Sequence, residues 1–373
     1  MDSLWWQMPG PARFLDRIDD DLRQGRNVVV PAPPHLSTEL REAVGDRISR
    51  NDFWRWRRLE LGDTSVRGAS PPEFLLSELG GSTREVATAS PRSVAGADAL
   101  RGFVIWIDGL TVHNWPAWKS FLVEYEHARR NGHWDAPLLC AGLPGFIDSE
   151  LGEAQIALVS RPWSGASDRL DMAMYASHLL SDRRLPRLHK RLLVSACTEL
   201  AGFDHSIARV LATLSLESVL APMTALLRIA GERGWVESMA GAPEWSNGMM
   251  DELEGSRFVH SAAVALAGDA AEISRRVWRA EVGIVFPFIE EQRIELLEPL
   301  RGRLRLPIDT HFGRIEEPED LEVGHLLWLA RSLDVPRRTL RLLERLVRMR
   351  HALAHLEPVA LTDLTSPEVL SVA

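Results

Sequence analysis

Two short stretches of the chain carry residue types that could hold a phosphate and a metal ion. A buried β-branched run at 27–30 is followed by a proline-rich turn and then by Ser37 and Thr38, where a helix is expected to begin. A second apolar run, GFVIWI, ends at Asp108. Nucleotide sites hold magnesium and phosphate with a hydroxyl at a helix start and an acid at a strand end.

The order of elements around these residues resembles the AAA+ and STAND branch of P-loop NTPases. A helix, a buried strand, a turn and a helix come first, a later strand ends in Asp108, and a helical bundle follows. The resemblance covers residues 1 to about 235. It implies a nucleotide-binding type of domain in which Ser37, Thr38 and Asp108 occupy vestigial site positions.

The residues that an active phosphate loop needs are missing from this stretch. The pattern G-x-x-x-x-G-K-[ST] supplies backbone N–H groups and a lysine cation to the phosphates. The segment PAPPHLST has neither its glycines nor its lysine, and its three prolines remove three N–H donors. Gly109 stands where AAA+ enzymes carry a glutamate that polarises water. We therefore expect no cofactor and no ATP hydrolysis, with Asp108 either ending a strand or marking a former magnesium position.

A helix expected over 339–356 carries three further candidates, Arg350, His351 and His355. His351 and His355 are four residues apart and share one face of the helix. Arg350 and His355 are five residues apart, which is roughly 140° around a helix of 3.6 residues per turn. A leucine stripe on another face, which includes Leu342 and Leu346, predicts burial or self-association.

The string RMRHALAHLEPV resembles the terminal helix of HEPN domains, with their R-x4-6-H pattern at Arg350 and His355. The resemblance covers residues 257 to about 360. In the nuclease members it implies a dimer, in which Arg350 would stabilise phosphate charge and His355 would assist proton transfer. His351 and His355 form an alternative pair. Many HEPN-like domains instead use this helix for packing and dimer formation without activity, and both readings remain open.

No other group of residues matches a known type of reactive centre. Cys140 and Cys197 lie in apolar stretches and are expected to be buried thiols. Since the chain lacks zinc-type cysteine and histidine spacing, no metal is expected.

The first 165 residues alternate apolar strands with helices. Strands are expected at 27–30, 54–61, 102–107, 137–140 and 156–160, and helices at 11–25, 37–48, 71–79 and 115–130. This alternation predicts an α/β fold with a parallel sheet and flanking helices.

Beyond residue 167 the periodicity is helical, which predicts an all-α remainder. The expected organisation is a degenerate P-loop NTPase-like α/β domain at 1–165, a helical bundle at 166–240, a linker at 241–256 and a HEPN-like helical domain at 257–373. Pro287 is expected to kink or break a long helical pair at 257–304. The stretch at 310–320 is expected to be a loop, and the tail after Pro358 to be frayed or loosely packed.

Composition narrows the possible partners. The 373 residues carry a formal net charge of -9, and an acidic chain is a poor general binder of nucleic-acid backbone. The arginine run from Arg337 to Arg350 is compatible with RNA or with a solvated helix face. The longest apolar runs are far shorter than the roughly 20 residues that span a bilayer, so no membrane contact and a cytoplasmic location are expected.

These features favour a non-catalytic regulatory or scaffold protein, that is, a pseudo-ATPase acting through protein partners or by self-association of its C-terminal helices. By resemblance alone, such domain pairs are typical of bacterial antiphage or conflict systems. The alternative is a HEPN-type ribonuclease that uses Arg350 and His355. A nucleotide sensor that binds without hydrolysis is disfavoured by the prolines of the loop.

Overall fold

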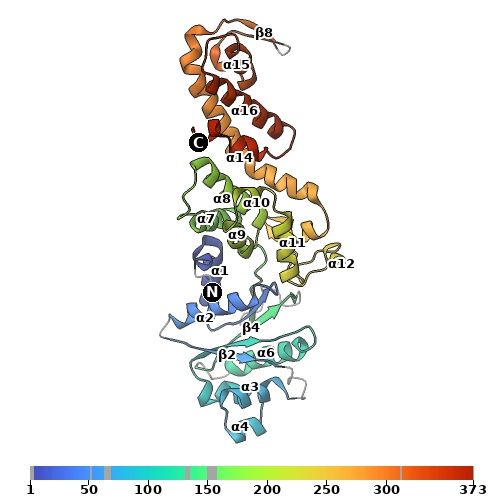
Figure 1. Cartoon of the computed structure of the whole chain (residues 1–373). Helices are drawn as coiled ribbons and strands as arrows, with labels where there is room; N and C mark the ends of the chain where they lie inside the picture. The colour runs from blue at the N-terminus through green and yellow to red at the C-terminus, as the bar shows by residue number, and fades with distance from the viewer. Residues whose placement is uncertain are drawn as a thin grey trace. The chain divides into compact units, whose positions relative to one another are not determined.

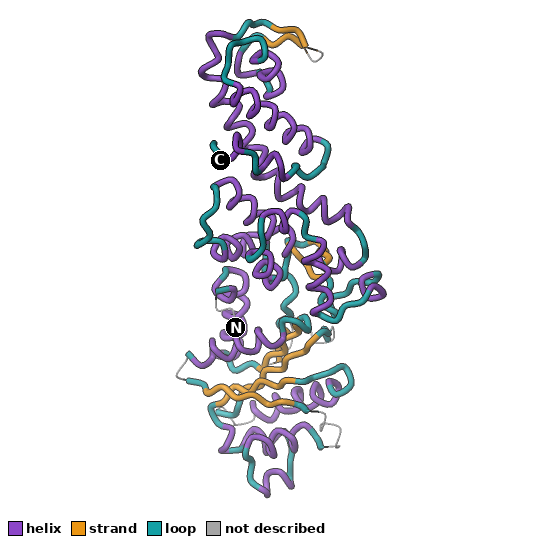
Figure 2. The backbone as a smooth tube through the Cα atoms, viewed as in Figure 1, coloured by secondary structure: helices purple, strands orange, loops and turns teal. Residues whose placement is uncertain are grey.

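The computed structural model describes residues 4–50, 53–62, 69–130, 135–148, 158–310 and 313–372. The chain forms two compact units, which are defined by their internal contacts. Unit 1 comprises Met1–Asp168 and Ala242–Val259, and unit 2 comprises Arg169–Gly241 and His260–Ala373. The long strands all belong to unit 1, whereas unit 2 is mainly helical (Figure 2).

Unit 1 contains the parallel sheet that the sequence predicts. Its strand order is β2-β3-β4-β1-β5, and every neighbouring pair is parallel. The strands are β1 (Asn27–Ala32), β2 (Arg55–Glu60), β3 (Phe103–Asp108), β4 (Leu138–Pro144) and β5 (Leu158–Ser160). Four of the five contain apolar runs that are buried almost throughout, because helices cover both faces of the sheet.

Helices pack on both faces of this sheet. The helix α2 (Ser37–Ser49) lies on one face, while α3 (Pro71–Leu79) and α6 (Trp115–Arg130) lie on the other (Figure 1). The helix α1 (Pro9–Arg23) packs against α2 and β1. Shorter helices complete the unit: η1 (Trp5–Gln7), α4 (Thr83–Ala87), α5 (Pro91–Gly96) and η3 (Asp98–Leu100). The expected α/β class is confirmed for this part of the chain.

A buried amide fixes β1 beside β4 at the amino end of the strands. The side chain of Asn27 is fully buried; its Oδ1 accepts the backbone N–H of Leu139 at 2.8 Å, and its Nδ2 donates to Glu126 at 2.8 Å. A different strand register would leave these polar groups buried without partners, which is costly. These two hydrogen bonds of Asn27 therefore help to specify which residues reach the opposite, carboxyl end of the sheet.

The stretch expected to be a linker, 241–256, contributes structure to unit 1. It contains β6 (Met250–Leu253), which pairs antiparallel with β7 (Ser256–Val259). Glu254 and Gly255 form the turn, both with positive φ, as a two-residue hairpin of this type requires. Asp251 accepts a hydrogen bond from the Ser164 hydroxyl at 2.6 Å, which ties the hairpin to the chain following β5.

Unit 2 combines the two helical regions that the sequence analysis treats separately. The helix α8 (Arg187–Ala201) packs along α14 (Ala270–Leu297), which runs without interruption through Pro287, where a kink or break is expected. The other helices are α7 (Arg169–Leu179), α9 (His205–Ala212), α10 (Leu216–Leu220), α11 (Met223–Glu232), α12 (Glu237–Ala240), α13 (Ser261–Leu266), η4 (Glu298–Arg303), η5 (Pro318–Asp320), α15 (Val323–Ala330) and α16 (Arg337–Ala354). Within 310–320 lies part of a short hairpin, β8 (Ile308–Thr310) with β9 (Gly313–Ile315).

The tail after Pro358 is part of the core of unit 2 and is not loosely packed. It forms α17 (Leu361–Leu364) and α18 (Pro367–Leu370), in which Leu364 and Val369 are fully buried. The buried ring of His189 hydrogen-bonds the Leu364 carbonyl at 3.0 Å. The packing of this segment cannot be predicted from sequence, because its helices are only four residues long and show no periodicity.

Candidate functional site

The residues predicted to mark a nucleotide site lie at one edge of the parallel sheet of unit 1. The strands β1, β4 and β3 are parallel neighbours, so their carboxyl ends lie at the same edge of the sheet. In parallel α/β sheets this edge is where ligands usually bind. Two features meet there: Asp108 at the end of β3, and the 33–36 loop between β1 and α2.

Asp108 is held between two arginines. Its Oδ2 accepts a hydrogen bond from Arg41 of α2 and forms an ion pair at 2.9 Å with Arg58 of β2, which also pairs with Glu60. Its Oδ1 accepts the backbone N–H of Gly109 at 3.0 Å. The side chains of Arg41 and Asp108 are only 14% and 20% exposed, so this ion pair is poorly screened by water. Two guanidinium groups therefore already neutralise the carboxylate that would face a magnesium ion in a nucleotide site.

The hydroxyl groups of the predicted phosphate loop are not arranged to cap α2. Leu36 takes the N-cap position, and no side chain makes a cap hydrogen bond there. The hydroxyl of Ser37 instead donates back to the Pro33 carbonyl at 3.2 Å, and Thr38 is exposed. The expectation that Ser37 or Thr38 caps this helix is therefore wrong, because Leu36 occupies the N-cap position and the Ser37 hydroxyl bonds to the proline turn instead.

The 242–249 segment of unit 1 packs closely against this loop. A Cβ atom on Gly248 would lie 2.7 Å from the His35 ring, and one on Gly145 would lie 2.7 Å from the Ser246 carbonyl oxygen and 3.1 Å from Pro34. Both glycines have positive φ, so they combine a backbone shape that glycine favours with contacts too close for any side chain. The loop after β1 is thus lined by the chain's own backbone.

The C-terminal candidates Arg350, His351 and His355 do not converge. His351 and His355 are exposed on one face of α16, with ring centroids 4.2 Å apart. The guanidinium of Arg350 pairs with Glu322, the residue before α15, at 2.9 Å. Within one chain, Arg350 is therefore directed to a different neighbour from the two histidines, as the helical spacing predicts.

Two residues of α14 hold the C-terminal end of α16 and the segment that follows it. The indole of Trp278 donates to the Leu353 carbonyl at 2.9 Å, and Glu281 accepts the backbone N–H of Val359 at 2.7 Å. Burial raises the pKa of Glu281 to about 8, so this acid retains its proton at neutral pH. The histidine-bearing turn is therefore held in place by buried contacts.

Most of the arginine face of α16 is neutralised within unit 2. Arg345 and Arg348 both donate to Asp363 of α17, at 2.6 and 2.8 Å, and Arg341 lies 3.6 Å from Glu368 of α18. Burial acts to raise the pKa of Asp363, but the guanidinium groups of Arg348 and Arg345 outweigh it and lower this pKa. The arginine run is explained by this packing, so it gives no specific support for RNA.

The apolar stripe of α16 is also used internally. Leu342, Leu346, Met349 and Leu353 are all buried in the core of unit 2. Self-association through this stripe, which the sequence analysis expects, would require that core to open. The C-terminal helices therefore offer no continuous leucine surface to a second chain.

A polar cluster that the sequence analysis does not anticipate lies inside unit 2. The Nε2 of His260 is 2.9 Å from Asp204 Oδ2, and Arg233 also donates to this carboxylate. The Nδ1 of His260 accepts the N–H of Ala262 at the start of α13, so the proton of the neutral ring is on Nε2 and is donated to Asp204. An Asp–His pair is a frequent acid–base device, but both side chains are at most 1% exposed.

Because no substrate could reach these buried side chains, we interpret the cluster as structural. Burial lowers the pKa of His260 to about 4, with the nearby charge of Arg233 acting in the same direction and the hydrogen bond to Asp204 opposing it. The only signal in the sequence is the position of Asp204 before α9, where it accepts the N–H of Ser206 as a cap. The partners are 29 and 56 residues away, so spacing could not reveal them.

Comparison with known proteins leaves the chain without a family assignment. No protein-family model matches it, and a search of curated proteins found no similar sequence. Among the described residues, no group of three or more histidine, cysteine, aspartate or glutamate side chains could hold a metal ion. In the same part of the chain, no helix combines the length and the apolar character needed to cross a membrane.

The His260 cluster predicts a specific loss of stability in acid. Because the unfolded chain takes up a proton near pH 6.5 and the folded chain only near pH 4, the free energy of unfolding falls as pH drops between these values. The loss is roughly 3 kcal/mol. Urea unfolding from pH 7 to pH 4 should show this loss in the wild type and a flatter profile in His260→Asn. The exposed His178→Asn variant is the control, and an equal flattening there would contradict the assignment.

Proposed function

We propose that the chain is a non-catalytic regulatory or scaffold protein. In this proposal its α/β unit resembles a nucleotide-binding domain, but the protein's own side chains and backbone occupy the carboxyl edge of the sheet. The observation that carries the proposal is the pairing of Asp108 with Arg41 and Arg58. A metal-bound triphosphate at this edge would have to compete with these ion pairs. It would also meet few backbone donors, because prolines precede α2.

The packing of the 242–249 segment supports the same proposal. In P-loop proteins, exposed backbone N–H groups cradle the phosphates. Here His35 of the loop after β1 lies close to Gly248, and Pro34 lies close to Gly145, so the loop's surface is engaged by the protein itself. Part of the proposal, that the protein acts through protein partners in a bacterial antiphage or conflict system, rests on the resemblance to AAA+/STAND and HEPN domains alone.

The first prediction from this proposal concerns nucleotide affinity. Titration calorimetry with Mg-ATP should give no binding at micromolar affinity, and the protein should not hydrolyse ATP, because Asp108 is neutralised and the loop lacks a lysine. Asp108→Ala is the matched variant. Micromolar binding by the wild type that is lost in Asp108→Ala would contradict the proposal, since it would locate the nucleotide at this edge.

The second candidate function, a HEPN-type ribonuclease, is favoured by one observation. His351 and His355 are exposed together on α16, and their ring centroids are 4.2 Å apart. The pairing of Arg350 with Glu322 is unfavourable to it, because the cation that would stabilise a scissile phosphate is already partnered. A second chain would have to supply the missing cation.

A cleavage assay separates the two functions. On the leading proposal, the wild type, Arg350→Ala and His355→Ala should show the same background RNA cleavage, and Arg350→Ala should melt slightly lower because it loses its Glu322 partner. His178→Ala, an exposed histidine on another helix, controls for contaminating nuclease. Cleavage that is lost in both α16 variants, with melting temperatures unchanged, would establish the ribonuclease instead.

A further inference from the structure

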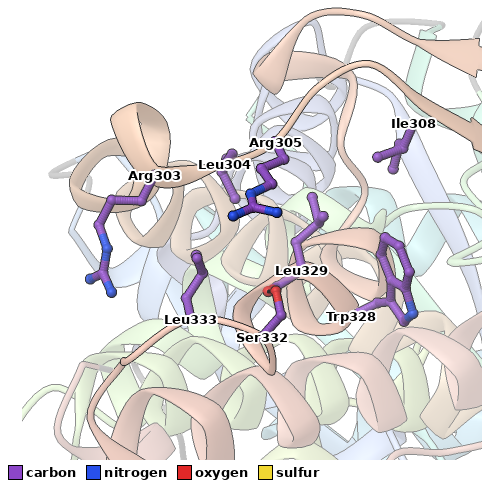
Figure 3. A pocket seen from close by; sticks show the side chains of 8 residues that line it. All are labelled: Arg303, Leu304, Arg305, Ile308, Trp328, Leu329, Ser332 and Leu333. Carbon is purple, nitrogen blue, oxygen red and sulfur yellow. Dashed lines mark hydrogen bonds between the residues drawn. The ribbon is translucent and has the colours of Figure 1, made fainter.

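Unit 2 contains a small surface pocket that neither proposed function uses. It lies between the segment that follows η4, the strand β8, and α15 with the turn after it. Its volume is about 380 Å³, which is within the range of small-molecule sites. The lining side chains shown in Figure 3 are those of Arg303, Leu304, Arg305, Ile308, Trp328, Leu329, Ser332 and Leu333.

The most unusual of these residues is Trp328. The indole is 64% exposed, whereas Leu326 and Ala330 on the same helix are fully buried. Among the described residues, no ring contact or hydrogen bond engages this indole. A large aromatic ring normally contributes its apolar area to a core or an interface. Trp328 therefore presents a flat ring to whatever enters the pocket.

A cation without an acidic partner accompanies this ring. Arg305 is exposed and makes no ion pair with any described residue, and Figure 3 shows its guanidinium directed over the pocket towards Leu329. Its neighbours in sequence are engaged: Arg301 pairs with Glu319, and Arg303 donates to the Asp334 carbonyl at 2.7 Å. The pocket thus combines two guanidinium groups that form no ion pair with a described residue, of which Arg303 is held by a backbone carbonyl, with the unpartnered aromatic ring of Trp328.

We propose that this pocket binds one nucleotide unit, with the base stacked on Trp328 and the phosphate paired with Arg305. Stacking on an aromatic side chain together with a backbone-binding cation is the usual way in which proteins hold unpaired nucleotides. An aliphatic ligand would not need the flat ring, and a neutral ligand would not need the cation. The unit can come from single-stranded nucleic acid or from a free mononucleotide, which share this chemistry.

Fluorescence anisotropy with a labelled twelve-nucleotide oligoadenylate tests this inference on the full chain. Trp328→Ala should weaken binding by at least about five-fold, because stacking on an aromatic ring contributes roughly 1–3 kcal/mol per base. Arg305→Ala should weaken binding and lower the slope of log affinity against log salt by about one, as expected for the loss of one phosphate contact. Competition by unlabelled AMP would indicate a free mononucleotide, and competition by oligonucleotides only would indicate a single strand.

Two variants outside the pocket serve as matched controls. Phe286→Ala removes another exposed aromatic ring, on α14, and Arg337→Ala removes another exposed arginine, at the start of α16. Both should bind as the wild type does, and thermal melting should show that all four variants are folded. Absence of binding by the wild type, or weakening by the control variants equal to that of Trp328→Ala, would overturn the proposal. A mononucleotide bound in this pocket would also register in the Mg-ATP titration. That binding would persist in Asp108→Ala and weaken in Trp328→Ala, so failure of this proposal and failure of the proposed function remain distinguishable.

Discussion

The carboxyl edge of the sheet in unit 1 depends on the ion pairs of Asp108. A carboxylate that is only 20% exposed at the carboxyl end of a parallel sheet needs compensating charge, and the chain supplies it from both sides through Arg41 and Arg58. In a magnesium-dependent nucleotide site the metal would provide that charge. Here the two arginines provide it, so the negative charge of Asp108 is balanced without a bound ligand. The close contacts of Gly248 and Gly145 then cover the neighbouring loop.

The strands of unit 1 can be predicted from the sequence, whereas contacts between residues that are far apart along the chain cannot. The β-branched and apolar runs predict four of the five strands, because fully buried strands require such residues. The alternation of apolar and polar residues predicts β2, most of which is not buried. The loop chemistry correctly draws attention to residues 31–38 and to Asp108. Arg41 and Asp108, however, are 67 residues apart, and no local pattern connects them. The turn-rich composition of 241–256 predicts a linker, although the chain at Gly248 is closely packed against His35.

The charged residues of unit 2 likewise have partners that no local sequence pattern reveals. The arginines of α16 form a basic face in sequence, which predicts either solvent or RNA as its surroundings. The acids that neutralise it, Asp363 and Glu368, lie in helices of four residues that have no periodic signal. Once these pairs form, much of the positive charge on this face is neutralised. A smaller feature that these pairs leave accessible is the pocket lined by the exposed ring of Trp328 and by Arg305.

The central claim is that Arg41 and Asp108 are coupled, and a double-mutant cycle with Arg41→Met and Asp108→Asn measures this directly from unfolding free energies. The account predicts a favourable coupling of about 1–3 kcal/mol, because the pair is hydrogen-bonded and poorly screened. The exposed pair Arg101–Asp98, whose side chains are 49% and 87% exposed, provides the reference cycle, with an expected coupling below about 0.5 kcal/mol. A coupling between Arg41 and Asp108 no larger than this reference would contradict the account, because Asp108 would then be available to a metal ion.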